Sequence, residues 1–194
     1  MTNGFYAMVS RMKYINRWAL MRNEHSENLA EHSFEVSVIA HALTVIGNKR
    51  FGKNLDCERA ALLGLFHDTP ETLTGDMPTP VKYYNDEVRN AYKVVEDVAC
   101  KSLISMLPED LKDEYEGLFI PEEKDKELWK YVKAADKISA LIKCIEEKKA
   151  GNSEFVLAGE GTLKAVEKLN LPEADMFVKE FLSSYELTLD ELKN

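Results

Sequence analysis

Four ionisable side chains lie at the ends or on the faces of apolar segments and could form a chemical site. The apolar run AALLGLF ends directly in His67 and Asp68, and His32 begins an apolar stripe further upstream. Asp136 falls at the edge of the buried face expected for a third segment. Because burying an unpaired carboxylate is costly, such a chain normally supplies a compensating charge. Two imidazoles and two carboxylates suit a divalent metal, which would supply it.

Each of these residues also has an ordinary structural interpretation. Asp136 could pair with a lysine of its own segment, and the candidates are Lys133, Lys137 and Lys143. A lone histidine such as His32 is most often a core residue bonded to a carbonyl group, and a histidine–aspartate pair at a helix end is common. Their combination on or beside buried helical faces is what favours the metal site.

Helical periodicity predicts the elements that position these groups. Asn28 is expected to begin a helix, with Glu31 three residues later as in a capping box. The face that this helix buries is formed by His32, Val36, Ile39, Leu43 and Ile46. Asp56 is expected to cap a second helix, running to His67, which is apolar on nearly every side and therefore predicted to cross the core. Pro70 then opens a loop, which includes GDMPTP.

The remaining segments also favour helices. Helices are predicted at about 5–21, 83–106, 109–117 and 122–150, and two or three more between about 154 and 192. No segment shows the sustained two-residue alternation typical of strands. The prediction is therefore an all-α bundle with the metal site between core helices. At 194 residues we expect a single domain over 1–194, with the C-terminal helices packed on it.

Composition excludes several classes of protein. The formal net charge of −9 argues against a nucleic acid polymer as partner, because no basic field is present to displace counterions. No run approaches 18 apolar residues and the N-terminus lacks a signal-peptide core, so we expect no membrane span. Three widely spaced cysteines, Cys57, Cys100 and Cys144, are typical of free thiols in a reducing compartment. A cytoplasmic protein is the expectation.

The order H…HD…D, with the adjacent pair ending a helix, resembles the signature of the HD-domain metal-dependent phosphohydrolases. The segments INRWALMRN, ENLAEHS, LLGLFHDTPETLTGDMPTPVKYYN and VKAADKISALIKCIEE are similar, more closely, to the bacterial YfbR-like 5′-deoxynucleotidases. Those enzymes remove phosphate from deoxyribonucleoside 5′-monophosphates. The similarity runs from about residue 5 to at least 160. It departs at Ala19, where proline is expected, and at Thr69 and Pro70, which replace small residues.

The resemblance implies a role for each site residue. The ligands of one divalent transition metal (Co, Mn, or another such as Zn, Ni or Fe) would be His32, His67, Asp68 and Asp136. The substrate-binding residues would be Arg17 at the phosphate, Trp18 at the sugar, and Asp76, Met77, Pro78 and Thr79 along the nucleoside pocket. The catalytic residues would be Glu71, which would serve acid–base chemistry, and Arg17, which would orient the phosphate. Without the resemblance, Glu71 is a helix N-terminal carboxylate favoured by the macrodipole, and Arg17 and Trp18 are a stacked structural pair.

The implied activity is metal-assisted hydrolysis of deoxyribonucleoside 5′-monophosphates by a homodimer. Two alternatives stay open. One is another HD-type phosphohydrolase, acting on a deoxynucleoside triphosphate or a signalling nucleotide; the other is a non-catalytic nucleotide-binding module. Two-metal HD phosphodiesterases need further histidines, and this chain has none after His67 and no Gly-Tyr-Pro triplet. Retention of four metal ligands with Glu71 and Arg17 disfavours a module without turnover.

Overall fold

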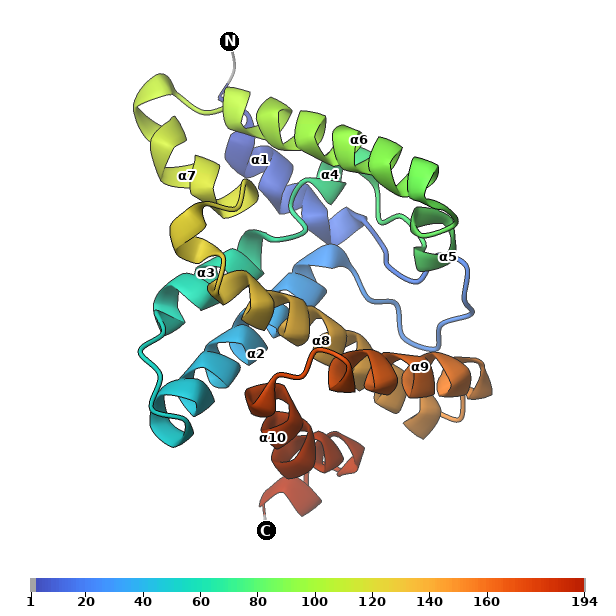
Figure 1. Ribbon diagram of the computed structural model, residues 1–194. Helices are drawn as coiled ribbons and strands as arrows, with labels where there is room; N and C mark the ends of the chain where they lie inside the picture. The colour runs from blue at the N-terminus through green and yellow to red at the C-terminus, as the bar shows by residue number, and fades with distance from the viewer. Residues whose placement is uncertain (1–2, 194) are drawn as a thin grey trace.

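Two long helices, α2 (Leu29–Arg50) and α8 (Leu128–Lys149), form the centre of the molecule, and α3 (Cys57–Phe66) packs against both. The computed structural model describes residues 3–193. In Figure 1, α6 (Asp86–Ser105) lies across one end of the molecule and α10 (Pro172–Phe181) lies at the other. Residues 3–193 contain no β-strand beyond an isolated antiparallel bridge between Asn16 and Asn28. The predicted all-α fold is confirmed.

The remaining elements are short or peripheral. The other α-helices are α1 (Phe5–Val9), α4 (Glu71–Thr74), α5 (Thr79–Lys82), α7 (Lys112–Phe119) and α9 (Val156–Glu167). Short 3₁₀ turns occupy Ser10–Tyr14, Glu109–Leu111, Glu123–Asp125, Ser153–Phe155, Leu182–Glu186 and Glu191–Lys193. The helices predicted from residue 83 onward are present, but they begin at other residues than predicted. The last two residues of the predicted GDMPTP loop belong to α5.

The helix predicted over 5–21 is wrong in its second half. The backbone becomes extended at Ile15, where φ is −100° and ψ is 106°. The backbone N–H of Arg17 donates to the Glu27 carbonyl, and that of Leu29 donates to the Ile15 carbonyl, each at 2.9 Å. Because these main-chain groups pair with the segment before α2, they cannot form helical hydrogen bonds.

The N-terminus of α2 forms as the sequence predicts. The Asn28 side chain accepts hydrogen bonds from the backbone N–H groups of Ala30 and Glu31, at 3.0 and 3.1 Å. The Glu31 carboxylate in turn accepts from the Asn28 N–H at 3.0 Å, which completes the capping box. The predicted apolar stripe that follows is buried, and His32 is fully buried in the first turn. The cap thus determines where the stripe begins and places His32 on the core side.

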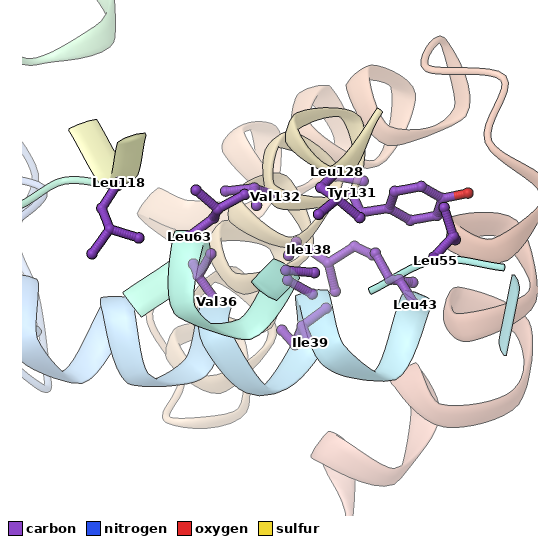
Figure 2. Packing of buried hydrophobic residues seen from close by; sticks show 14 of the residues in the cluster. Val36, Ile39, Leu43, Leu55, Leu63, Leu118, Leu128, Tyr131, Val132 and Ile138 are labelled. Atoms are coloured by element: carbon purple, nitrogen blue, oxygen red, sulfur yellow. The ribbon is translucent and has the colours of Figure 1, made fainter. Parts of the chain in front are cut away.

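The apolar core lies between α2, α3 and α8. Figure 2 shows the labelled side chains of this region, which are Val36, Ile39, Leu43, Leu55, Leu63, Leu118, Leu128, Tyr131, Val132 and Ile138. The close approach of α2 and α3 depends on Gly64, where a Cβ atom would come within 3.0 Å of the Ser37 Cα. This approach brings the N-terminal end of α2 near the C-terminal end of α3, where the candidate site lies.

One face of α3 remains in solvent. This helix was predicted to cross the core because it is apolar on nearly every side, and it does pack against α2 and α8, but Leu62 and Leu65 on its other side are exposed. The face that meets α2 and α8 carries Ala60, Leu63 and Gly64, and these residues are buried. Single exposed leucines are ordinary on protein surfaces and need no further explanation.

By length and composition alone, α2 could cross a membrane, with a mean hydropathy of 1.2 over its most apolar window. Half of that window is buried inside the fold. Core helices of globular proteins pass the same test, and α2 is the central core helix. The finding therefore gives little support to a membrane span.

Candidate active site

His32, His67 and Asp68 converge where α2 begins and α3 ends. One ligand atom from each lies within 4.8 Å of the other two. Asp68 Oδ2 is 3.1 Å from His67 Nε2 and 3.5 Å from His32 Nε2. Asp136, on α8, joins through His32, whose Nε2 lies 3.3 Å from Asp136 Oδ1. The structure therefore brings the four predicted metal ligands to one place, which we name the histidine–aspartate cluster.

Hydrogen bonds on the far side of each imidazole determine which nitrogen faces the cluster. His67 Nδ1 donates to the Gly64 carbonyl at 2.7 Å. His32 Nδ1 lies 3.0 Å from the Ser139 hydroxyl, which donates to the Glu35 carboxylate at 2.5 Å. Since that hydroxyl donates to Glu35, it accepts the Nδ1 proton of His32. Both rings thus turn Nε2 toward the cluster, and Nε2 is the atom through which each imidazole could bind a metal.

Several buried polar atoms around the cluster have no hydrogen-bond partner. They are His32 Nε2, His67 Nε2, Glu71 Oε2, and Nε and Nη1 of Arg17. An unpaired buried polar group costs roughly 1–3 kcal/mol, so five of them in one region indicate a place shaped for ligands. The imidazole nitrogens with their neighbouring carboxylates fit a divalent transition metal. The Arg17 guanidinium fits an anion.

The charges of the cluster favour a cation. Burial raises the pKa of Asp68, but the imidazoles of His67 and His32 outweigh it and hold that pKa well below its usual range. Burial also opposes ionisation of Asp136, yet His32 lowers its pKa to about 2. Burial and Arg17 lower the pKa of His32, but the neighbouring carboxylates of Asp136 and Asp68 outweigh them and raise it overall. Each carboxylate depends on a positive neighbour, a role that a metal ion can take.

Glu71 is buried beside the cluster, in the first turn of α4. Its backbone N–H donates to the Asp68 carbonyl at 3.0 Å, and the residue is only 7% exposed. Burial, then the nearby carboxylates of Asp68 and Asp76, raise the pKa of Glu71 to about 9. A helix-dipole interaction, typically under about 1 kcal/mol, does not account for such burial. A buried carboxyl with a raised pKa beside the histidine–aspartate cluster is a candidate acid–base group.

Arg17 and Trp18 reach the site from the irregular segment before α2. Trp18 has a φ of 60°, in the left-handed region that bulky residues rarely adopt. Its indole Nε1 donates to Glu27 Oε2 at 2.8 Å, and its ring packs against Phe155 with centroids 5.2 Å apart. The Arg17 side chain is 11% exposed, and its Nε lies 3.6 Å from the same Glu27 oxygen. Glu27 thus holds both side chains.

A cleft of about 660 Å³ opens at this place, within the size range of small-molecule sites. Its lining includes all six residues predicted to contact substrate, which are Arg17, Trp18, Asp76, Met77, Pro78 and Thr79. Asp136 lines it too, so the cleft meets the histidine–aspartate cluster. Small residues of α8 and α9 form another part of the wall, namely Ala140, Ala158, Gly161, Thr162 and Ala165.

Sequence patterns did not indicate three residues that support the site. Glu35 and Ser139 lie three residues after His32 and Asp136 on their respective helices, so helical spacing alone could have found them. Glu27 lies in an irregular segment, where no periodicity connects it with Arg17 and Trp18. Its contacts are visible only in the folded chain.

The fold matches solved structures of HD-domain phosphohydrolases. One from Listeria innocua is similar with a TM-score of 0.80 at 25% identity, covering 98% of this chain and 92% of that one. A cyanophage S-2L HD phosphohydrolase, solved with dA and one catalytic Zn²⁺ ion, has a TM-score of 0.65 at 17% identity, covering 92% of this chain and 96% of that one. The second likeness concerns the fold alone. With the histidine–aspartate cluster, the fold defines the class of HD-domain phosphohydrolases.

The relationship is closer than this class. The family model described as 5′-deoxynucleotidase YfbR-like matches residues 4–185. A 5′-deoxynucleotidase of Vibrio vulnificus (strain YJ016) is 46% identical over 188 residues, covering 97% of each chain. The 5′-deoxynucleotidase YfbR of Escherichia coli is 45% identical over 188 residues, covering 97% of this chain and 94% of that one. The chain belongs to the YfbR-like 5′-deoxynucleotidase family.

Proposed function

We propose that the protein is a metal-dependent 5′-deoxynucleotidase, which hydrolyses deoxyribonucleoside 5′-monophosphates to deoxyribonucleosides and phosphate. The observation that carries this proposal is the meeting of two unsatisfied groups at one cleft, in a chain of this family. The imidazole Nε2 atoms of His32 and His67 lack hydrogen-bond partners, and so do two guanidinium nitrogens of Arg17. A metal and a phosphate are the ligands that would satisfy them.

The proposed metal ligands are His32, His67, Asp68 and Asp136. The orientation of the two imidazoles and the low pKa of the two carboxylates support this assignment. The donor set accepts Mn, Co, Fe, Ni or Zn, among which availability usually decides. When bound, such an ion polarises the phosphoryl group and makes water a stronger acid.

Arg17 would bind the phosphate. Burial opposes its charge, but Glu27, Asp68 and Asp136 raise its pKa, so the guanidinium stays cationic. Its Nε and Nη1 donors are buried and unused. A planar guanidinium can donate to two phosphate oxygens at once and offset the charge that develops on them.

Glu71 would move the proton. Its unpartnered Oε2 is the atom that would take a proton from the attacking water or give one to the leaving 5′-oxygen. The raised pKa means that burial holds a proton on this carboxyl more firmly than on an exposed glutamate. Without such a group the leaving alkoxide would depart unprotonated, which is unfavourable near neutral pH.

The nucleoside would occupy the rest of the cleft. The Trp18 indole, held by Glu27 and Phe155, forms a rigid wall that would lie against the sugar. A rigid wall supports preference for deoxyribose, because a 2′-hydroxyl would need space that the wall occupies. Asp76, Met77, Pro78 and Thr79 would line the nucleoside pocket, as members of the same cleft.

We further propose a cytoplasmic homodimer. A second groove, of about 1230 Å³, lies among α2, the end of α8, and α10 with the turns after it. Its lining includes exposed apolar side chains of Val38, Phe181 and Leu192. Apolar grooves of this kind are usually covered by a partner, and a second copy would do so. The three cysteines are free, which fits a reducing cytoplasm. Sedimentation equilibrium tests the dimer.

The test of the proposed activity is a phosphate-release screen. Ribonucleoside and deoxyribonucleoside 5′-monophosphates and triphosphates are compared after chelation and after addition of Mn or Co. We expect phosphate from the deoxyribonucleoside monophosphates, and only with metal. Release of triphosphate from deoxynucleoside triphosphates would favour a different HD phosphohydrolase. Binding of nucleotides without turnover would favour a non-catalytic module.

A further inference from the structure

Glu27 contacts both side chains that close the cleft on one side. Its Oε2 accepts a hydrogen bond from Trp18 Nε1 at 2.8 Å and lies 3.6 Å from Arg17 Nε. The Glu27 side chain is 13% exposed, so water weakens these interactions little. One carboxylate oxygen therefore connects the guanidinium with the indole.

The main chain reinforces this connection. The carbonyl of Glu27 accepts the backbone N–H of Arg17 at 2.9 Å, and the neighbouring residues Asn16 and Asn28 form the isolated bridge. Glu27 thus meets the Arg17–Trp18 segment with its backbone and its side chain together. A rotation of either side chain would have to break the carboxylate contact.

We propose that Glu27 is a positioning residue. One of its carboxylate oxygens, Oε2, holds Arg17 toward the phosphate and Trp18 toward the sugar. This inference rests on the proposed function of the cleft. Neither the sequence motifs nor the helical faces assign Glu27 a role, because it lies in the irregular segment, directly before the N-cap residue Asn28 of α2.

The geometry explains how one carboxylate can serve both neighbours. The short hydrogen bond goes to the indole, and the longer ion pair leaves Arg17 Nε and Nη1 without hydrogen-bond partners. The guanidinium is therefore balanced in charge while its donors stay available for a ligand. Trp18 needs the restraint because a φ of 60° is unfavourable for a bulky side chain.

The test separates the two contacts. Glu27→Gln keeps an oxygen that can accept the indole N–H but removes the charge beside Arg17, whereas Glu27→Ala removes both. Glu24→Ala is the matched control. It also removes one carboxylate from this segment, but the Glu24 side chain pairs with Arg22 in solvent rather than with Arg17 or Trp18. All variants are made in a Trp129→Phe background, which leaves Trp18 as the only tryptophan of the chain. Circular dichroism melting checks that each variant folds.

The expected results differ between the two variants. In Glu27→Ala, acrylamide should quench Trp18 fluorescence more strongly and the preference for deoxyribonucleotides should narrow. Its kcat/KM should fall by roughly 100-fold, the size expected for a misplaced substrate contact. Glu27→Gln should keep the quenching and the sugar preference of the parent while kcat/KM falls by roughly 10-fold, because the loss is confined to Arg17. Glu24→Ala should match the parent in every readout.

Two results would overturn the proposal. One is unchanged quenching of Trp18 in a folded Glu27→Ala variant. The other is a loss of activity in that variant with an unchanged deoxyribose preference, because a general destabilisation would produce it. The fluorescence measurement needs no substrate, so it still decides the positioning role if the parent protein releases no phosphate. Absence of turnover in the parent would count against the proposed function alone.

Discussion

Two buried polar clusters lie along α8, and they differ in how completely their atoms are paired. Around Glu147, which is fully buried, the carboxylate accepts from the N–H groups of Glu24 and His25 at 2.9 and 3.1 Å. It also accepts from Asn152 at 2.8 Å and from Lys143 at 2.5 Å. In the histidine–aspartate cluster, by contrast, the imidazole nitrogens lie 3.1–3.5 Å from carboxylate oxygens but have no hydrogen-bond partner.

The difference shows what each cluster does. The cluster around Glu147 is a structural anchor, which ties the segment leading to Glu27 onto α8; Asn152 adds a hydrogen bond to the Arg22 carbonyl at 2.7 Å. Fully paired networks of this kind rigidify a protein. Unpaired buried nitrogens serve no such purpose and become favourable only when a ligand arrives. The anchor therefore supports the irregular segment that the open cluster and its cleft require.

Of the changes that distinguish the two clusters, loss of the metal should have the largest effect on phosphate release. Chelation is expected to abolish phosphate release from deoxyribonucleoside monophosphates, and Mn or Co should restore it, because the unpaired imidazoles regain their partner. Asp68→Ala should lose turnover that added metal does not restore. Full activity in a preparation shown by elemental analysis to be metal-free would contradict this expectation.

Removal of Glu71 should have the next largest effect. Glu71→Ala is expected to lower kcat by at least about 100-fold with little change in KM, because a positioned acid–base group acts mainly in the transition state. The variant should stay folded and keep its metal. Turnover, melting temperature and bound metal are to be measured on one preparation. A variant retaining its metal and more than about a third of the parent's turnover would reduce Glu71 to a helix-terminal carboxylate, whose contribution is small.

Trp18→Ala should change selectivity more than rate. Without the indole wall, kcat/KM for ribonucleotides should rise relative to that for deoxyribonucleotides. The ratio of kcat/KM for dAMP over AMP should therefore fall toward one. A merely hydrophobic pocket rejects an added hydroxyl by only about 100-fold, and a rigid wall that excludes the 2′-hydroxyl sterically can discriminate better than that. Equal rates on AMP and dAMP in the unmodified protein would remove the basis of this expectation.

Substitution in the anchor should affect stability first. Hydrogen bonds from Lys143 and the loop outweigh burial and lower the pKa of Glu147 to about 2. Because the folded-state pKa is depressed, the stabilisation is present above the unfolded-state pKa of about 4.3 and is lost as pH falls toward 2. Glu147→Gln should lower the free energy of unfolding by about 3 kcal/mol at pH 7, or the melting temperature by roughly 6–12 °C.

The pH dependence of that variant gives the control. The difference in melting temperature between the parent and Glu147→Gln should shrink as pH falls from about 4.3 toward 2, since protonation removes the same charge from the parent. An equal difference at pH 7 and pH 3 would show that packing, rather than the charge of Glu147, provides the stabilisation.

Local patterns predicted the helices that carry the site, and non-local pairing explains what they missed. The capping box at Asn28 and the stripe from His32 depend on neighbours within one or two turns, so their positions could be read directly. The irregular conformation of Ile15 to Trp18 depends on pairing with the residues before α2, which no periodicity reveals. Glu27 was missed for the same reason. The exposed leucines of α3 show that apolar composition alone does not decide burial.

The most direct test is the number of metal ions that each chain retains. The protein, Asp68→Ala and Glu147→Gln are loaded with Mn or Co, freed of excess ion, and analysed for metal per folded chain. If the open cluster binds the metal and the closed anchor does not, the parent and Glu147→Gln should each retain one ion, and Asp68→Ala close to none. Equal retention by Asp68→Ala, or no retention by the parent, would contradict the assignment of the metal to the histidine–aspartate cluster.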